Sequence, residues 1–327
     1  MSVIEIIKAC ATAIFVTVSA AGVGAQDFPG RPVTMIVPFA AGGAGDILAR
    51  SIGARLEPIW GKPLVVENKP GAGGVIGAVA TAKADPDGYT LMIAPSATMA
   101  VNVSLFKALS YDPVTDFVPL ALAAQTPFVL VVNPDLPINS VADLIKYAKE
   151  NPGKLSFGSG GVGASHHLYG EMFKSLTGVQ MTHVPYRGTV PALNDVIAGH
   201  IPLLFSDPPP ALPQIAAGKV RAIGVTTAKR IASLPNVPPI GDTVQGFDTA
   251  PWQMLMAPAG TPRPTIDRLQ SEIVRYIASP EGQEKLVNEM GLIPGAPTSP
   301  DELAKFVAKE VEDWGKLVRL AGAAGIE

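Results

Sequence analysis

Short apolar runs alternate along this chain with amphipathic segments of helical length. The run 33–37 is the first predicted strand, and in the following segment 46–56 the residues Leu48, Ile52 and Leu56 fall near one face of a helix. Further strand-like runs stand at 64–67, 91–95, 128–132, 155–158, 181–185, 203–205 and 222–226. This alternation predicts an α/β protein whose sheets are mainly parallel and flanked by helices.

Capping residues mark the start of two more predicted helices. Ser140 and Asp143 form a Ser-x-x-Asp cap, and Ser299 with Glu302 forms a capping box in front of the C-terminal amphipathic segment. Between them, the segment 266–277 carries an apolar stripe at helical spacing. These features are structural, because apolar stripes of this kind usually belong to a core.

The length of 327 residues and the 47% of hydrophobic positions favour two domains over one. We expect two lobes joined by short crossings near 123–126 and 247–253. The predicted division is 1–25 for a signal peptide, 26–124 plus 250–327 for the first lobe, and 125–249 for the second lobe.

The N-terminus has the pattern of a secretory signal. Lys8 precedes an apolar run over 9–21, and small residues follow, which predicts cleavage near Ala25. The apolar run is too short to span a membrane. The chain's one cysteine, Cys10, lies within this segment, so the mature protein is expected to be exported without thiols or disulfides.

Two glycine-rich turns form a quasi-repeat, one at 38–46 and the other at 158–165. Each follows a predicted strand and precedes a predicted helix, where glycine lets backbone N–H groups approach an anion and the helix N-terminus attracts it. Asp46 and Ser165 are suited to cap the two helices. Either turn alone could be an ordinary tight connection. Two of them in different lobes, at the carboxyl ends of strands, indicate a clamp for an anion.

Other functional classes have weaker support. A net charge of −3, with basic residues scattered along the chain, argues against nucleic acid as a partner. Gly158, Gly160 and Gly163 match G-x-G-x-x-G, which raises a nucleotide-binding enzyme as an alternative. The acidic residue that a dinucleotide-binding unit would carry about 20 positions later is missing. Ser165, His183 and Asp207 could be imagined as a hydrolase triad, yet no G-x-S-x-G elbow occurs. We expect no enzyme, cofactor or metal site.

Several motifs, in order, resemble the Bug family, the extracytoplasmic solute receptors of tripartite tricarboxylate transporters. The resemblance covers almost the whole mature chain. It rests on IVPFAAGGAGD at 36–46, ENKPGAGG at 67–74, PDGYTL at 86–91, FGSGGVGAS at 157–165 and HVPYRG at 183–188. The resemblance implies a two-lobed periplasmic-binding-protein fold. Such a receptor closes on a solute in the periplasm, holds a carboxylate between two strand–turn–helix elements, and delivers the solute to a membrane permease.

Carried onto this chain, the resemblance implies a first grip over 39–46 and a second over 160–166. Ser96 and Thr98 should line the same cleft, although Met99 follows where many relatives have a histidine nearby. Asp207 could meet an ammonium or hydroxyl group of the solute. The expected ligand-binding residues are Phe39, Ala40, Gly43, Ala44, Asp46, Ser96, Thr98, Gly160, Gly161, Gly163, Ser165, His166 and Asp207.

The expected partners are a small carboxylate and the permease subunits of a tripartite tricarboxylate-type transporter, with the receptor itself a monomer. A receptor that binds a neutral solute, or that signals to a membrane partner, stays an alternative, because closure on a ligand suits both roles. The chemical body of the solute is left open among dicarboxylates, tricarboxylates, amino acids, and aromatic or pyridine carboxylates.

Overall fold

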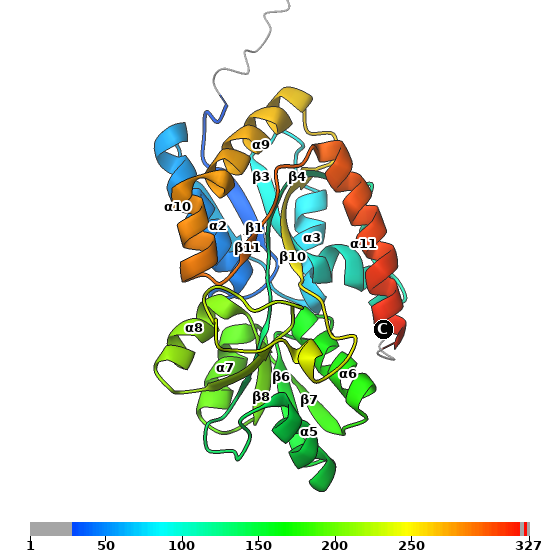
Figure 1. Ribbon diagram of the computed structural model, residues 1–327. Helices are drawn as coiled ribbons and strands as arrows, with labels where there is room; N and C mark the ends of the chain where they lie inside the picture. The colour runs from blue at the N-terminus through cyan, green and yellow to red at the C-terminus, as the bar shows by residue number, and fades with distance from the viewer. Residues whose placement is uncertain (1–27, 321–323, 326–327) are drawn as a thin grey trace, which may run out of the picture.

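The computed structural model describes residues 28–320 and 324–325. The predicted signal peptide and Cys10 lie outside these residues. Two lobes, each built on one β-sheet, are stacked along the long axis of the molecule (Figure 1). Within the described ranges, no helix is long and apolar enough to cross a membrane.

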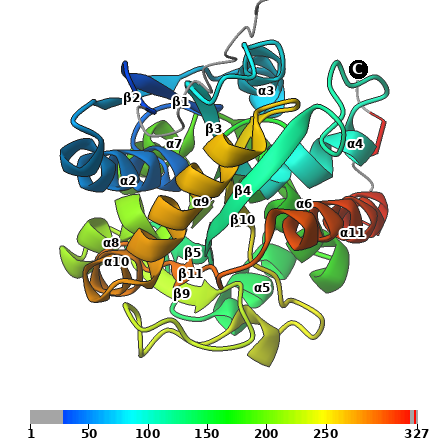
Figure 2. The ribbon, with the colours of Figure 1, turned by 90° about the horizontal axis from the view of Figure 1, so that it is seen from above.

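The first lobe contains a six-stranded sheet. Its order is β11-β4-β10-β3-β1-β2. The strands are β1 (Val33–Val37), β2 (Leu64–Asn68), β3 (Thr90–Pro95), β4 (Phe117–Gln125), β10 (Trp252–Pro258) and β11 (Ile293–Pro294). Figure 2 shows α2 (Ala44–Trp60) and α9 (Arg263–Ala278) on one side of β4 and β10, and α11 (Pro300–Leu320) on the other.

The second lobe contains a five-stranded sheet in the order β7-β6-β8-β5-β9. Its strands are β5 (Val129–Val132), β6 (Leu155–Ser159), β7 (Met181–Pro185), β8 (Leu203–Ser206) and β9 (Arg221–Val225). The helices of this lobe are α5 (Val141–Glu150), α6 (Ser165–Thr177), α7 (Thr189–Ile197) and α8 (Pro208–Ala216). Short helical segments complete the chain: η1 (Ala72–Gly74), α3 (Val75–Ala82), η2 (Ala97–Val101), α4 (Asn102–Leu105), η3 (Ile240–Asp242), α10 (Pro280–Gln283) and η4 (Glu284–Glu289).

The expected α/β class is correct, but both sheets are mixed rather than mainly parallel. β1 is parallel to β2 and β3, whereas β10 is antiparallel to β3 and β4. In the second sheet β5 is antiparallel to β8 and β9. The cause is the double crossing between lobes: a strand that arrives from the other lobe enters its sheet at the cleft and runs away from it, while the neighbouring strands run toward it.

The chain passes from β4 to β5 between Gln125 and Val129, and it returns between β9 and β10. The first sheet therefore draws its strands from 33–125 and 252–294, and the second from 129–225. The division of the lobes at 124/125 and 249/250 stays a prediction. β5 and β10 are buried along their whole length, because helices cover both faces of each sheet.

Two predicted caps are confirmed and two are wrong. The Ser140 hydroxyl accepts the Asp143 N–H at 3.1 Å, and Ser299 exchanges hydrogen bonds with Glu302 as a capping box does. By contrast, Asp46 lies in the first turn of α2 behind the N-cap Gly43, and Ser165 is the first residue of α6. Both helices begin earlier than expected, so neither side chain occupies the capping position.

Candidate functional site

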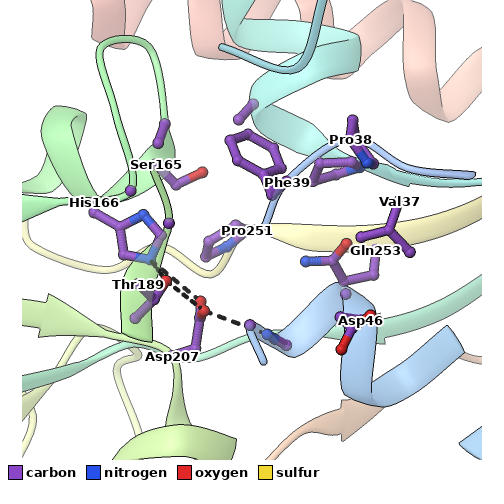
Figure 3. Close-up of a pocket in the computed structure, with 18 of the residues that line it drawn as sticks. Val37, Pro38, Phe39, Asp46, Ser165, His166, Thr189, Asp207, Pro251 and Gln253 are labelled. Carbon is purple, nitrogen blue, oxygen red and sulfur yellow. Dashed lines mark hydrogen bonds and ion pairs between the residues drawn. The ribbon is translucent and has the colours of Figure 1, made fainter. Parts of the chain in front are cut away.

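A cavity lies between the lobes, where β1, β3 and β10 of the first sheet meet the starts of α6 and α7 and the end of β8. It encloses about 590 Å³ of space between atoms, part of it open to solvent. The view in Figure 3 places Phe39, Pro38 and Gln253 on one side and His166, Thr189 and Asp207 on the other. The wall also includes Val37, Ala40, Gly43, Ala44, Gly45, Asp46, Ile93, Pro95, Ala97, Phe128, Gly160, Ala164, Ser165, Gly188 and Pro251.

The first glycine turn brings the N-terminus of α2 to this cavity. Gly43 has an extended backbone and Ala44 begins the helix, so the first-turn N–H groups have no acceptor within the helix. The Asp46 carboxylate accepts the Gly42 N–H at 3.0 Å and pairs with Arg50 at 2.9 Å. Burial disfavours the charged form of Asp46, but Arg50 and the other donors outweigh it and lower its pKa. The hydrogen bond from Gly42 to Asp46 holds the first glycine turn in place.

The second glycine turn brings the N-terminus of α6 to the opposite wall. Gly160, Ser165 and His166 line the cavity, and Ser165 and His166 are both buried. Behind the turn, the Ser159 hydroxyl contacts His183 Nε2 at 2.6 Å. Burial lowers the pKa of His183 to about 3, so its ring is neutral at physiological pH. Different side chains therefore support the two turns: Asp46 supports the first, and His183 supports the second through Ser159.

Asp207, which follows β8, bridges the two lobes. Its Oδ2 accepts the Ala44 N–H at 3.3 Å and the Thr189 hydroxyl at 2.8 Å, and its Oδ1 lies 3.4 Å from His166 Nε2 (Figure 3). Burial disfavours its charged form, yet His166 and these hydrogen bonds outweigh that effect and hold its pKa below the ordinary value. A protein carboxylate therefore already binds at the start of α2.

The lobes also touch directly around the cavity. A Cβ added to Gly42 would lie 2.9 Å from Val190, and one added to Gly188 would lie 2.8 Å from Ala40. The first contact joins the first turn to α7, and the second joins the residue before α7 to the first turn. Together with the bond from Ala44 to Asp207, these contacts show that the two lobes are closed on each other.

The family described as "Tripartite tricarboxylate transporter family receptor" matches residues 48–323. The chain belongs to this family. The resemblance expected from the motifs is therefore confirmed, and the receptor can be compared with known members.

Among curated relatives, Protein BugT of Bordetella pertussis is 37% identical over 309 residues, which cover 93% of each chain. Two solved structures share the fold. R. palustris Rpa4515 with adipate is 39% identical, covers 91% of this receptor and 100% of that chain, and has a TM-score of 0.88. MatC (Rpa3494) from Rhodopseudomonas palustris with bound malate is 32% identical, with coverage of 89% and 100% and a TM-score of 0.83. These likenesses confirm the two-lobed α/β receptor fold.

Nine of the residues expected from the sequence come together at the cavity of this receptor: Phe39, Ala40, Gly43, Ala44, Asp46, Gly160, Ser165, His166 and Asp207. The other four do not. Gly161 lines an outer recess that it shares with Phe39 and Arg187.

Ser96, Thr98 and Gly163 lie outside both spaces. Ser96 and Thr98 are fully buried, because the chain coils into the π-helix η2 directly after β3, and their neighbours Pro95 and Ala97 face the cavity instead. Gly163 is packed against the first lobe: a Cβ there would lie 2.5 Å from Leu105. In this arrangement of the lobes these three residues do not line the cavity, and their role in ligand binding stays a prediction.

The suggested hydrolase triad does not assemble. His183 contacts Ser159 rather than Ser165, and Asp207 contacts His166 rather than His183. Across the part of the chain that the structure describes, no three His, Cys, Asp or Glu residues are grouped to hold a metal ion.

The wall also contains residues that are absent from the expected ligand-binding set, among them Phe128, Thr189, Pro251 and Gln253. Phe128 and Pro251 lie in the two crossings between lobes, and Gln253 follows on β10. The sequence offered one indication of Pro251 and Gln253, the predicted crossing near 247–253, because residues that join two lobes border the cleft between them. Nothing in the sequence indicated that Thr189 would line the cavity.

Proposed function

We propose that this receptor captures a small carboxylate in the periplasm, holds it in the cavity between its lobes, and delivers it to the membrane permease of a tripartite tricarboxylate-type transporter. The observation that carries the proposal is the convergence of two helix N-termini, α2 and α6, on one cavity from opposite lobes. Helix N-termini bind anions without basic side chains, and no Lys or Arg lines this cavity among the described residues.

The relatives support the same class of ligand. Adipate and malate are both carboxylates, and each is bound to a structure that matches nearly this whole chain. Export to the periplasm is supported by the predicted signal peptide at 1–25. The receptor acts here by binding, and we assign it no catalytic step.

A thermal-shift screen of the chain without residues 1–25 tests the proposal. Candidate ligands are mono-, di- and tricarboxylates, with nucleotides and neutral sugars as negative controls. A ligand at 100 times its Kd adds about 2.7 kcal/mol to native stability, which corresponds to a shift of roughly 5 °C in a protein of this size. Stabilisation by carboxylates supports the proposal. Stabilisation by the negative controls alone, or by nothing in the panel, contradicts it.

Gly43→Val tests whether the cavity is the site. Gly43 has φ −77°, which any residue can adopt, and its added Cβ would meet Asp207 at 3.4 Å, an ordinary contact. The two further methyl groups would occupy the cavity and cost about 1–3 kcal/mol of binding, or roughly 5- to 150-fold. Ala41→Val is the matched control, because Ala41 belongs to the same turn but is exposed and outside the wall. Equal carboxylate affinity in both variants would place the site elsewhere.

A further inference from the structure

Gln253 is a polar side chain on an otherwise apolar strand. β10 has the sequence WQMLMAP and runs between β3 and β4 inside the first sheet. Gln253 is only 8% exposed and lines the cavity. A buried amide at such a position calls for hydrogen-bond partners, because unpaired polar atoms destabilise a folded protein and are rare in it.

The fold provides this amide with no partner. Within the described residues, Gln253 Oε1 is buried and contacts no donor, and Nε2 donates to no protein acceptor. Oε1 is turned toward the start of α2, where a Cβ on Gly45 would lie 3.5 Å from it. Nε2 is not enclosed, and Figure 3 shows it directed into the cavity. The side chain therefore presents a donor to whatever occupies the cavity.

Ser165 presents a second donor from the opposite lobe. It is the first residue of α6 and is 5% exposed, and its hydroxyl has no hydrogen-bond partner among the residues that the structure describes. Figure 3 shows this hydroxyl directed into the cavity from the side opposite Gln253. The carboxylates of the wall, Asp46 and Asp207, are already paired with protein donors. The amide and the hydroxyl can both donate, which suits an anion in the cavity.

We infer that Gln253 Nε2 donates a hydrogen bond to a carboxylate oxygen of the ligand, as the first-lobe counterpart of Ser165. This inference rests on the proposed function and adds to it a side chain that sets ligand affinity. Because the two donors belong to different lobes, a ligand that pairs with both stabilises the closed receptor over the open one. The pairing also accounts for an amide that gains nothing from the fold, since residues kept for function are often unfavourable for stability.

Gln253→Met removes both polar atoms of the amide with little change in volume. Isothermal titration of the chain without residues 1–25 measures its affinity for succinate, adipate and propionate. We expect the variant to bind these acids about tenfold or more weakly than the native receptor. Gln125→Met is the matched control, because Gln125 lies opposite Trp252 on the neighbouring strand β4 and outside the cavity wall. Its affinity should equal that of the native receptor.

Urea denaturation of the ligand-free proteins separates a binding role from a structural one. Because the amide has no partner in the fold, Gln253→Met should be at least as stable as the native receptor. Weaker binding without a loss of stability supports the inference. Unchanged affinity overturns it, and so does a lower free energy of unfolding, which would show that the amide serves the fold. If the native receptor binds none of the acids, the proposed function itself fails and the inference with it.

Nitrogen-15 NMR provides a readout in the native receptor. The side-chain amide signals that are missing from the spectrum of Gln253→Met belong to Gln253, and those missing from Gln125→Met belong to Gln125. On addition of succinate, the Gln253 amide protons should shift, because a hydrogen bond to a carboxylate deshields them, while the Gln125 signals should stay in place. Gln253 signals that do not move when titration shows the acid bound would overturn the inference.

Discussion

Replacing Asp207 by Asn probes the bond that joins the lobes. The substitution keeps the size of the side chain but removes its charge. The amide oxygen can replace Oδ2 and still accept from Ala44 and Thr189. The new NH₂ group then takes the place of Oδ1 and faces the protonated Nε2 of His166, 3.4 Å away. Two donors would oppose each other in a buried site.

The expected cost follows from what the charge contributes. A hydrogen bond to a charged group is worth about 1.5–3 kcal/mol, and a negative charge at a helix N-terminus about 0.3–2 kcal/mol, here at the start of α2. These contributions overlap, because the Ala44 N–H belongs to both. We therefore expect Asp207→Asn to lower the free energy of unfolding at pH 7 by about 2–4 kcal/mol.

The dependence on pH has a definite sign. The pKa of Asp207 is lower in the folded protein than its ordinary value of 3.8. The stabilisation is therefore complete above the unfolded pKa, from about pH 5 upward, and it is lost as the pH falls through the lower, folded pKa. The difference between the native protein and Asp207→Asn should be present from pH 5 to 8 and should shrink below about pH 4.

Urea denaturation followed by tryptophan fluorescence, repeated across this pH range, measures the difference. Asp46 also has a lowered pKa, but it is present in both proteins and cancels in the comparison. Small-angle scattering of the two proteins without ligand adds a second measurement, because the hydrogen bond from Ala44 across the lobes is weakened when its acceptor loses the negative charge, and the variant should be more open. A change in unfolding free energy below about 0.5 kcal/mol, the scatter of ordinary surface substitutions, or a change that does not shrink in acid, would refute this account of Asp207.

Two structural predictions concern the scaffold. Ser140→Ala removes the hydroxyl that accepts the Asp143 N–H and should cost about 1 kcal/mol, with Ser140→Thr as a control that retains the cap; denaturation midpoints check both. Glu310→Ala removes the carboxylate that accepts the indole N–H groups of Trp252 and Trp314, both at 2.8 Å. It should cost about 1–3 kcal/mol and alter the tryptophan fluorescence, and an unchanged melting temperature would show that solvent replaces the bond.

Local pattern determined much of the framework. The strand at 33–37 and the caps at Ser140 and Ser299 were predictable, because each depends on residues within a few positions of one another. β4 and β10 were not predicted. Both faces of β10 are buried, so its residues show no alternation of polar and apolar positions. Its antiparallel direction depends on the crossing between lobes, which leaves no mark on the sequence of the strand itself.

The candidate site divides in the same way. The two glycine turns could be read from the sequence, because a strand, a glycine-rich turn and a helix start are contiguous and their backbone chemistry is local. The partners of those turns could not. Asp207 meets Ala44 across 163 positions of the chain, and Gln253 faces His166 from the other lobe. Hydrogen bonds and buried acceptors of this kind exist only once the lobes have closed. The sequence therefore determined how an anion could be held, and the tertiary structure decided which side chains surround it.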